Sequence, residues 1–153
     1  MASPDPRFHE ETRGIHNEHE ELVGQLDQID EALEQITCYA EIFTDLATAN
    51  QAISRGKWMA EWLPQHYARE ETTVLETIAR MSPELASFAR EMKRQHDEMR
   101  VRLESLRDHL AHLNEARDLE SDVETIKQEC TYLTRMMRLH MAAEEKKLFS
   151  LEN

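Results

Sequence analysis

Apolar residues recur along this chain at alternating spacings of three and four, which is the period of one buried face of an α-helix. Four segments carry such a stripe. The first stripe consists of Ile15, Leu22, Leu26, Ile29, Leu33 and Ile36, and the second of Met59, Leu63, Val74 and Ile78. The third consists of Leu85, Phe88, Met92, Met99, Leu103, Leu106, Leu110 and Leu113, and the fourth of Val123, Ile126, Cys130, Leu133, Met137, Leu148 and Leu151. The pattern predicts four amphipathic helices.

Capping residues mark where the first two of these helices begin and end. Asp5 followed by Pro6 is typical of a helix start, because proline is favoured at the first helical position. We expect the first helix to end between residues 38 and 43. A second helix then runs from about residue 45 to residue 80.

Similar signals mark the starts of the other two helices. Ser82 followed by Pro83 again combines a cap with a first-turn proline, which predicts that the third helix begins there. Ser121 and Glu124 form a capping box, which predicts the start of the fourth helix. The polar segment 114–120 before it is expected to be a loop.

The short connections between the predicted helices favour antiparallel neighbours. The sequence therefore predicts an all-α fold, an antiparallel up-down-up-down four-helix bundle. The composition agrees, because the chain has 3 Gly and 4 Pro and is rich in good helix formers. No long run of alternating β-branched and aromatic residues indicates a sheet. A length of 153 residues without an internal linker predicts a single domain over residues 1–153.

The formal net charge of −13 excludes some partners. An acidic surface repels phosphate backbones, so we expect no binding to nucleic acid. No apolar stretch is long enough to span a membrane, and the first residues lack the basic and apolar regions of a secretory signal. We therefore expect a cytoplasmic protein that does not associate with a membrane.

Histidine and glutamate interrupt every apolar stripe at one level. The interrupting residues are His19 in the first helix, His66 and Glu70 in the second, His96 in the third, and His140 and Glu144 in the fourth. In each hairpin the interruptions lie at similar distances from the connecting loop, roughly 30 Å of helix in the outer hairpins and roughly 20–25 Å in the middle one. The fold therefore predicts that these side chains meet in one layer.

Two pairs of segments repeat around these residues. Residues 66–75 read HYAREETTVL and residues 140–149 read HMAAEEKKLF, so each has a histidine followed by a glutamate pair and ends in two apolar residues. Similarly, HEELVGQLDQI begins at His19 and HDEMRVRLESL begins at His96. A histidine and a glutamate four residues apart lie on the same helix face. The second and fourth helices can therefore each offer an imidazole and a carboxylate to the interior.

Two glutamates in an apolar core are costly to bury, and facing carboxylates repel one another. A pair of metal cations removes both problems. In the arrangement that fits best, the glutamates bridge two ions and each ion takes one histidine pair, His19 with His66 and His96 with His140. Ligation by imidazole and carboxylate without thiolate fits iron or manganese, and zinc remains an alternative.

A metal-free interpretation stays open beside this one. A single histidine on an apolar face is usually a hydrogen-bonded core residue, and isolated HxxxE pairs also stabilise surface helices. A bundle without metal would act as a helical interaction domain. The doubled motif and the common level of the interrupting residues favour the metal site.

The order His, HxxxE, His, HxxxE on four helices resembles the hemerythrin-like family, also called the HHE cation-binding domain. The resemblance extends from about Phe8 to Phe149, and the HxxxEE segments at 66–75 and 140–149 are its most specific part. It implies an antiparallel four-helix bundle around two iron ions joined by an oxo or hydroxo bridge. The ligands that it implies are His19, His66, Glu70, His96, His140 and Glu144.

The chain departs from the oxygen-carrying members of that family. Those carriers have HxxxH on the third helix, whereas the residue four after His96 is Arg100. The carriers also use an acid five residues after the fourth-helix histidine, where this chain has Glu145. Glu144 is in phase with the apolar stripe and parallels Glu70, so we prefer it as the ligand. With fewer protein ligands, each metal is expected to keep an open or water-filled position.

The resemblance therefore implies a non-haem di-iron protein that binds or reacts with a small oxidant, namely oxygen, peroxide or nitric oxide. Reversible oxygen carriage fits less well than peroxide or nitric oxide chemistry, and enzymatic activity stays an open question. A second hypothesis is an iron-handling or redox-sensing module that acts through metal release or through a protein partner.

Residues beside the six carry further hypotheses. Tyr67 either packs beside the layer, which we favour, or binds metal through its phenolate. Glu71 and Glu145 either accept hydrogen bonds from the ligand imidazoles or are solvated charges. His16 lies on the polar flank of its helix, so we favour His19 as the ligand.

Overall fold

A computed structural model describes residues 5–38, 46–112 and 119–152 of the chain. Every regular element among these residues is helical, and none is a strand. The elements are α1 (Pro6–Cys38), α2 (Leu46–Glu70), the π-helix η1 (Glu71–Leu75), α3 (Glu76–Ala79), α4 (Pro83–His112) and α5 (Leu119–Glu152). Because the residues at the junctions keep helical backbone angles, α2, η1 and α3 form one continuous rod.

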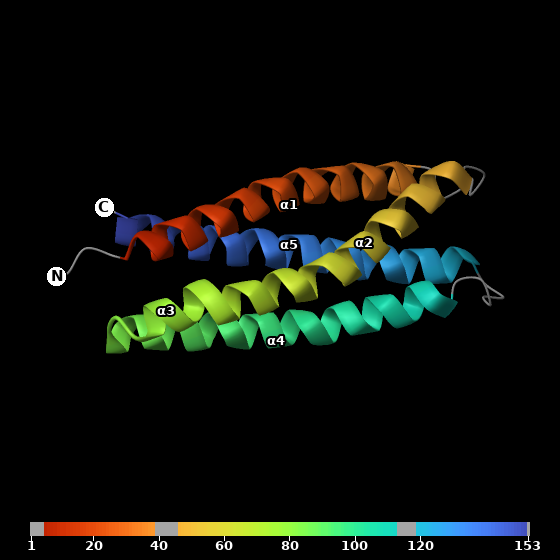
Figure 1. The fold of residues 1–153 in the computed structure, drawn as a ribbon. Helices are drawn as coiled ribbons and strands as arrows, with labels where there is room; N and C mark the ends of the chain where they lie inside the picture. The colour runs from red at the N-terminus through yellow and green to blue at the C-terminus, as the bar shows by residue number, and fades with distance from the viewer. Residues whose placement is uncertain (1–4, 39–45, 113–118, 153) are drawn as a thin grey trace.

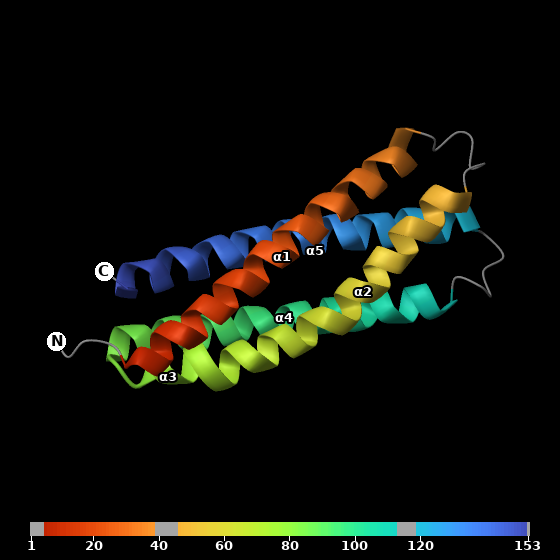
Figure 2. The same ribbon diagram turned by 45° about the horizontal axis from the view of Figure 1, so that its top comes forward.

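The rods alternate in direction, as Figures 1 and 2 show. α1 packs against α2 and α5, and α4 packs against α2 and α5, so each rod has two neighbours. The beginning of α1 and the end of α5 lie at the same end of the bundle (Figure 1). The predicted all-α, up-down-up-down four-helix bundle is therefore confirmed. No described helix is long and apolar enough to cross a membrane.

Most predicted helix starts agree with the structure. The carboxylate of Asp5 accepts a hydrogen bond from the backbone N–H of Arg7 (3.0 Å), and the Ser82 hydroxyl accepts one from Leu85 (3.1 Å). These contacts satisfy backbone groups that a helix start leaves without partners.

The predicted start of the fourth helix is wrong by two residues. α5 begins at Leu119, so the Ser121 capping box lies inside the helix. Leu119 and Glu120 are good helix formers, and they continue the helix beyond the predicted cap. The rest of the predicted loop, 114–118, lies outside the described residues, as does the segment 39–45 after α1.

A layer of buried polar side chains divides the apolar interior into two cores. The larger core includes leucines of α1 and α4, namely Leu22, Leu26 and Leu33 and Leu103, Leu106 and Leu110. The terminal core lies toward the chain ends and includes Phe8, Ile15, Ile78 and Leu148. The polar layer lies off-centre, nearer the end where α1 begins and α5 ends.

The π-helix η1 is a feature that the sequence pattern did not reveal. It begins directly after Glu70. The hydroxyls of Thr72 and Thr73 donate hydrogen bonds to the carbonyl oxygens of Ala68 and Arg69. Such side-chain bonds compete with the backbone ladder and favour a local widening of the helix. Single π-turns are frequent at functional sites, which draws attention to Glu70.

Leu106 tests the contribution of the larger core to stability. Its side chain is fully buried, so Leu106→Ala should lower the free energy of unfolding by about 3 kcal/mol, because the lost contacts leave a cavity. The matched control is Val101→Ala on the same helix, where the valine is 68% exposed and the expected change is below about 0.5 kcal/mol. Urea denaturation of both variants measures the difference, and equal effects would contradict the assigned core.

Candidate metal centre

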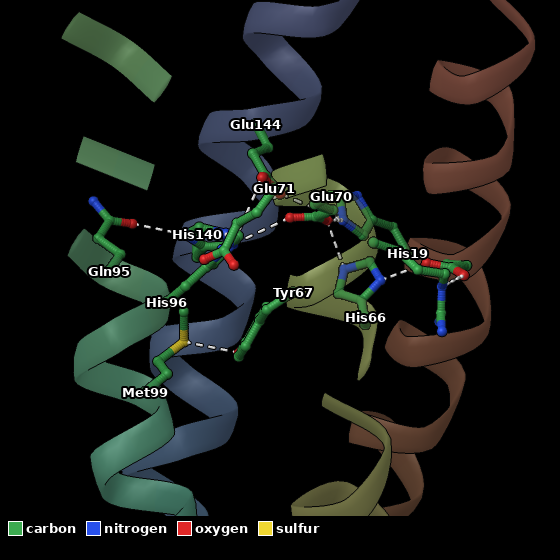
Figure 3. A network of polar contacts seen from close by, with 12 residues as sticks. His19, His66, Tyr67, Glu70, Glu71, Gln95, His96, Met99, His140 and Glu144 are labelled. Carbon is green, nitrogen blue, oxygen red and sulfur yellow. Dashed lines mark hydrogen bonds and ion pairs between the residues drawn. The ribbon is translucent and has the colours of Figure 1, made fainter. Parts of the chain in front are cut away.

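Six polar side chains from all four rods meet in the buried layer (Figure 3). Each is at most 3% exposed. They are His19 from α1, His66 and Glu70 from α2, His96 from α4, and His140 and Glu144 from α5. The structure thus brings together every residue that the sequence placed at this level.

The Glu70 carboxylate lies at the centre of the cluster. Its Oε1 lies 2.7 Å from Nε2 of His19 and 2.6 Å from Nε2 of His66. Its Oε2 lies 3.1 Å from Nε2 of His96. One carboxylate therefore reaches imidazoles from both halves of the chain, as a bridging ligand must.

Glu144 faces the same space from α5. Its Oε1 lies 3.5 Å from Nε2 of His19 and 3.3 Å from Nε2 of His140. Its Oε2 lies 4.0 Å from Nε2 of His96. Glu144 therefore also stands between the two histidine pairs, although its contacts are longer than those of Glu70.

The donor atoms fall into two groups that share Glu70. One group contains His19, His66 and Glu70, and the other contains Glu70, His96, His140 and Glu144. Within each group, one donor atom per residue lies within 4.8 Å of the others. Three or four nitrogen and oxygen donors at this spacing can hold a divalent transition-metal ion. The geometry provides two adjacent positions joined by a carboxylate.

Several donor atoms in the cluster are buried without a hydrogen bond of acceptable geometry. They are His66 Nε2, Glu70 Oε2 and Glu144 Oε1, and the only other such side-chain atom among the described residues is Thr12 Oγ1. Leaving a buried polar atom without a partner costs about 1–3 kcal/mol. Cations at the two positions would provide the missing partners, so the residues present fit a metal pair.

Without a metal, the cluster balances its charge with protons. Burial favours neutral Glu70, but the close imidazoles of His19, His66 and His96 outweigh it and hold the pKa of that carboxyl well below its usual range. Burial, and then the charge on Glu70, raise the pKa of Glu144. Burial also opposes the charges on His19 and His96, yet hydrogen bonds to carboxylates raise both pKa values, that of His19 to about 10. A cation entering the cluster must displace protons.

Each of the four imidazoles turns Nε2 inward and donates a hydrogen bond outward from Nδ1. The acceptors are Glu145 for His19 (2.8 Å), Glu18 for His66 (2.6 Å), Glu71 for His96 (3.2 Å) and Gln95 for His140 (2.8 Å). Such acceptors fix the ring orientation and raise the basicity of the inward nitrogen.

Two of these acceptors were foreseen and two were missed. The hypothesis that Glu71 and Glu145 accept hydrogen bonds from the cluster imidazoles is confirmed. Glu18 and Gln95 were not recognised, although each directly precedes a cluster histidine in the chain. A polar residue directly before both His19 and His96 was the sequence signal that could have identified these acceptors.

Tyr67 packs against the cluster and points its hydroxyl away from it. The ring stacks on His96, with centroids 4.3 Å apart, and the hydroxyl donates to the sulfur atoms of Met99 (3.2 Å) and Met137. Burial, followed by the nearby charge of Glu70, raises the pKa of Tyr67 well above its usual value. These contacts support the packing role of Tyr67 over phenolate ligation.

Glu145 and Arg100 also lie outside the cluster. Glu145 contacts Nδ1 of His19 and of His16 from the outer side, whereas Glu144 faces the interior. Arg100 does not reach the inner layer and instead forms a bidentate ion pair with Glu71 (2.7 and 2.9 Å). Arg100 stands where an HxxxH pair would have its second histidine. Its guanidinium instead holds Glu71, the outward acceptor of His96.

Comparison with known proteins agrees with this geometry. The family model described as the hemerythrin HHE cation binding domain matches residues 10–151, which is nearly the whole chain. The chain therefore belongs to the hemerythrin HHE cation-binding domain family, and its buried histidine and glutamate cluster supports metal binding. Searches of curated proteins and of solved structures give no significant match.

Tyr67→Phe separates packing from phenolate ligation. Because the hydroxyl bonds to methionine sulfur, the variant should keep its metal content and its visible spectrum, and it should lose about 1 kcal/mol of stability at most. Elemental analysis and absorption spectra of the iron-loaded proteins make the comparison. Loss of a visible charge-transfer band in the variant would mean that the phenolate binds metal after all.

Proposed function

We propose that His19, His66, Glu70, His96, His140 and Glu144 hold two iron ions. The observation that carries the proposal is the pair of donor groups sharing Glu70, with unpartnered buried atoms in both. Mixed nitrogen and oxygen donors without thiolate suit iron, and they also accommodate manganese or zinc. The outward hydrogen bonds of the four imidazoles support the proposal, because they hold every Nε2 toward the centre.

The function that this site supports best is binding of, or reaction with, a small oxidant such as oxygen, peroxide or nitric oxide. Bound iron would supply Lewis acidity and redox equivalents. Four imidazoles and two carboxylates shared by two ions leave room for an external ligand, because Arg100 adds no nitrogen to the inner layer. The protein residues supply buried, low-dielectric surroundings and the fixed donors.

A second candidate function is iron handling or redox sensing, with metal release or a protein partner as the output. One observation favours it. Glu145 is partly exposed and contacts the buried ring of His19, so this carboxylate links one side of the cluster to solvent. A cluster with such a link is suited to exchanging its metal.

Peroxide tests the two candidates against each other. Purified protein should contain close to two iron ions per chain, and its ultraviolet–visible spectrum should change when peroxide is added. A peroxide disproportionation rate that rises in proportion to iron content supports oxidant chemistry. Loss of iron on peroxide treatment without turnover supports sensing. Absence of stoichiometric metal, together with unchanged melting after chelation, would favour a metal-free interaction domain.

His140→Ala should remove most of the bound metal while the helices survive. It deletes a donor of the larger group, so metal affinity should fall at least about tenfold. The metal-dependent rise in melting temperature should shrink accordingly, because a ligand that binds only the native state stabilises it. His109→Ala is the matched control, since His109 is exposed and contacts Glu129 instead. Elemental analysis, circular dichroism and melting curves decide, and equal metal content in both variants would contradict the ligand set.

Metal binding should release protons. The pKa of His19, raised to about 10, means that this imidazole carries an extra proton at neutral pH in the metal-free protein, and the raised pKa of His96 favours its protonated form. The incoming cation expels these protons, so affinity should fall as the pH is lowered. Titration calorimetry in buffers of different ionisation enthalpy measures the proton number. A binding enthalpy that does not depend on the buffer would contradict this charge balance.

A further inference from the structure

An open groove lies between α1 and α5 beside the metal centre. It has a volume of about 540 Å³, and one wall includes His19, a member of the buried cluster. Val23, Met141 and Ala142 give the groove apolar walls, and Glu145 adds a carboxylate. Glu145 is partly exposed there, so a cation in solvent can reach its carboxylate.

A continuous series of donor atoms connects this groove with the interior. Glu20 lies 3.3 Å from Nε2 of His16, and Glu145 lies 3.0 Å from Nδ1 of the same ring. Glu145 also lies 2.8 Å from Nδ1 of His19, whose Nε2 lies 2.7 Å from Glu70. The side chains of Glu20, His16, Glu145 and His19 are 70%, 52%, 34% and 4% exposed, so the series runs from solvent to the core.

Glu145 differs from the other outward acceptors of the cluster. Glu18 is bound by Arg69 (2.6 Å), and Glu71 is bound by Arg100. Gln95, the acceptor for His140, carries no charge. Within the described parts of the chain, Glu145 forms no ion pair with lysine or arginine, and its partners are imidazoles. On three sides of the cluster, the outward acceptor is therefore either bound by a guanidinium or uncharged.

The internal repeat explains why one side stays open. Val23 stands four residues after His19, and Arg100 stands four residues after His96. On the α2–α4 side the guanidinium occupies both oxygens of Glu71. On the α1–α5 side the shorter, uncharged valine leaves the groove and its carboxylate accessible. Arg138 also lines the groove, but Asp27 and Asp30 bind its guanidinium at 2.7 Å each.

We propose that metal ions reach the buried cluster through the groove between α1 and α5, where Glu145 takes the cation from solvent. The His19 ring stands between this carboxylate and the interior, because it contacts Glu145 with one nitrogen and Glu70 with the other. Unpartnered Glu144 Oε1 lies 3.5 Å beyond that ring. The inference rests on the proposed function, because it requires that the cluster binds metal.

Rates of metal uptake test the proposed entrance. Metal-free protein is mixed rapidly with cobalt(II), and the visible absorbance of the bound ion follows uptake. Val23→Arg places a guanidinium beside Glu145 as Arg100 is placed beside Glu71, so uptake should slow several-fold while the final cobalt content stays the same. Val101→Arg is the matched control, because it adds the same charge at an exposed site on α4 and should keep the wild-type rate.

A second pair of variants tests the groove by volume instead of charge. Ala142 lines the groove two residues after His140, and Ala68 holds the equivalent position two residues after His66. Ala142→Trp should slow uptake, whereas Ala68→Trp should not. This pair decides the question if Val23→Arg fails to fold, as circular dichroism would reveal.

The outcomes separate the two proposals. Wild-type protein that binds no cobalt, iron or other divalent cation refutes the metal-binding function itself. Wild-type protein that loads fully, with Ala142→Trp and Val23→Arg loading at the rates of their controls, refutes only the entrance. Slower loading in both groove variants at unchanged final content supports it.

Discussion

The architecture depends on burying two carboxylates in an apolar bundle. Glu70 and Glu144 are each about 1% exposed, and isolated charges at such depth are strongly unfavourable. Four imidazoles face them, and those imidazoles in turn need outward acceptors for their second nitrogens. The polar layer is therefore a compensated unit, and removing one member leaves the others with unsatisfied charge. This requirement explains why all four rods contribute to it.

The compensation follows a cyclic order around the bundle. The histidine of α1 donates to an acceptor on α5, and the histidine of α2 donates to one on α1. The histidine of α4 donates to an acceptor on η1, and the histidine of α5 donates to one on α4. The order reflects the two repeats of the chain, in which Glu18 matches Gln95 and Glu145 matches Glu71. Where the two repeats differ in sequence, the sides of the cluster differ as well. Gln95 has an amide where Glu18 has a carboxylate, and Arg100 stands where the other repeat has Val23, so the sides lined by α4 differ from the α1–α5 side, where the groove lies.

The sequence predicted the inner layer well because helical periodicity reports which face of a helix is buried. His66 and Glu70 share a face whatever the details of packing, and equal distances to the loops bring the helices into register. Outer contacts such as that between Glu18 and His66 depend on how neighbouring helices rotate, which periodicity does not report. The π-turn after Glu70 depends on hydroxyl groups competing with the backbone, and the stripe looks the same with or without it.

The polar layer also bears on how the bundle holds together as a whole. Apolar contacts propagate cooperativity, and here they are interrupted between the larger core and the terminal core. Without a cation, several buried atoms at this boundary lack hydrogen-bond partners, so the layer contributes less to holding the terminal core, with Phe8 and Ile78, against the larger one. Partial opening confined to such a subdomain is a common mode of native-state fluctuation. A metal pair bonded to all four rods would join the two cores into one cooperative folding unit.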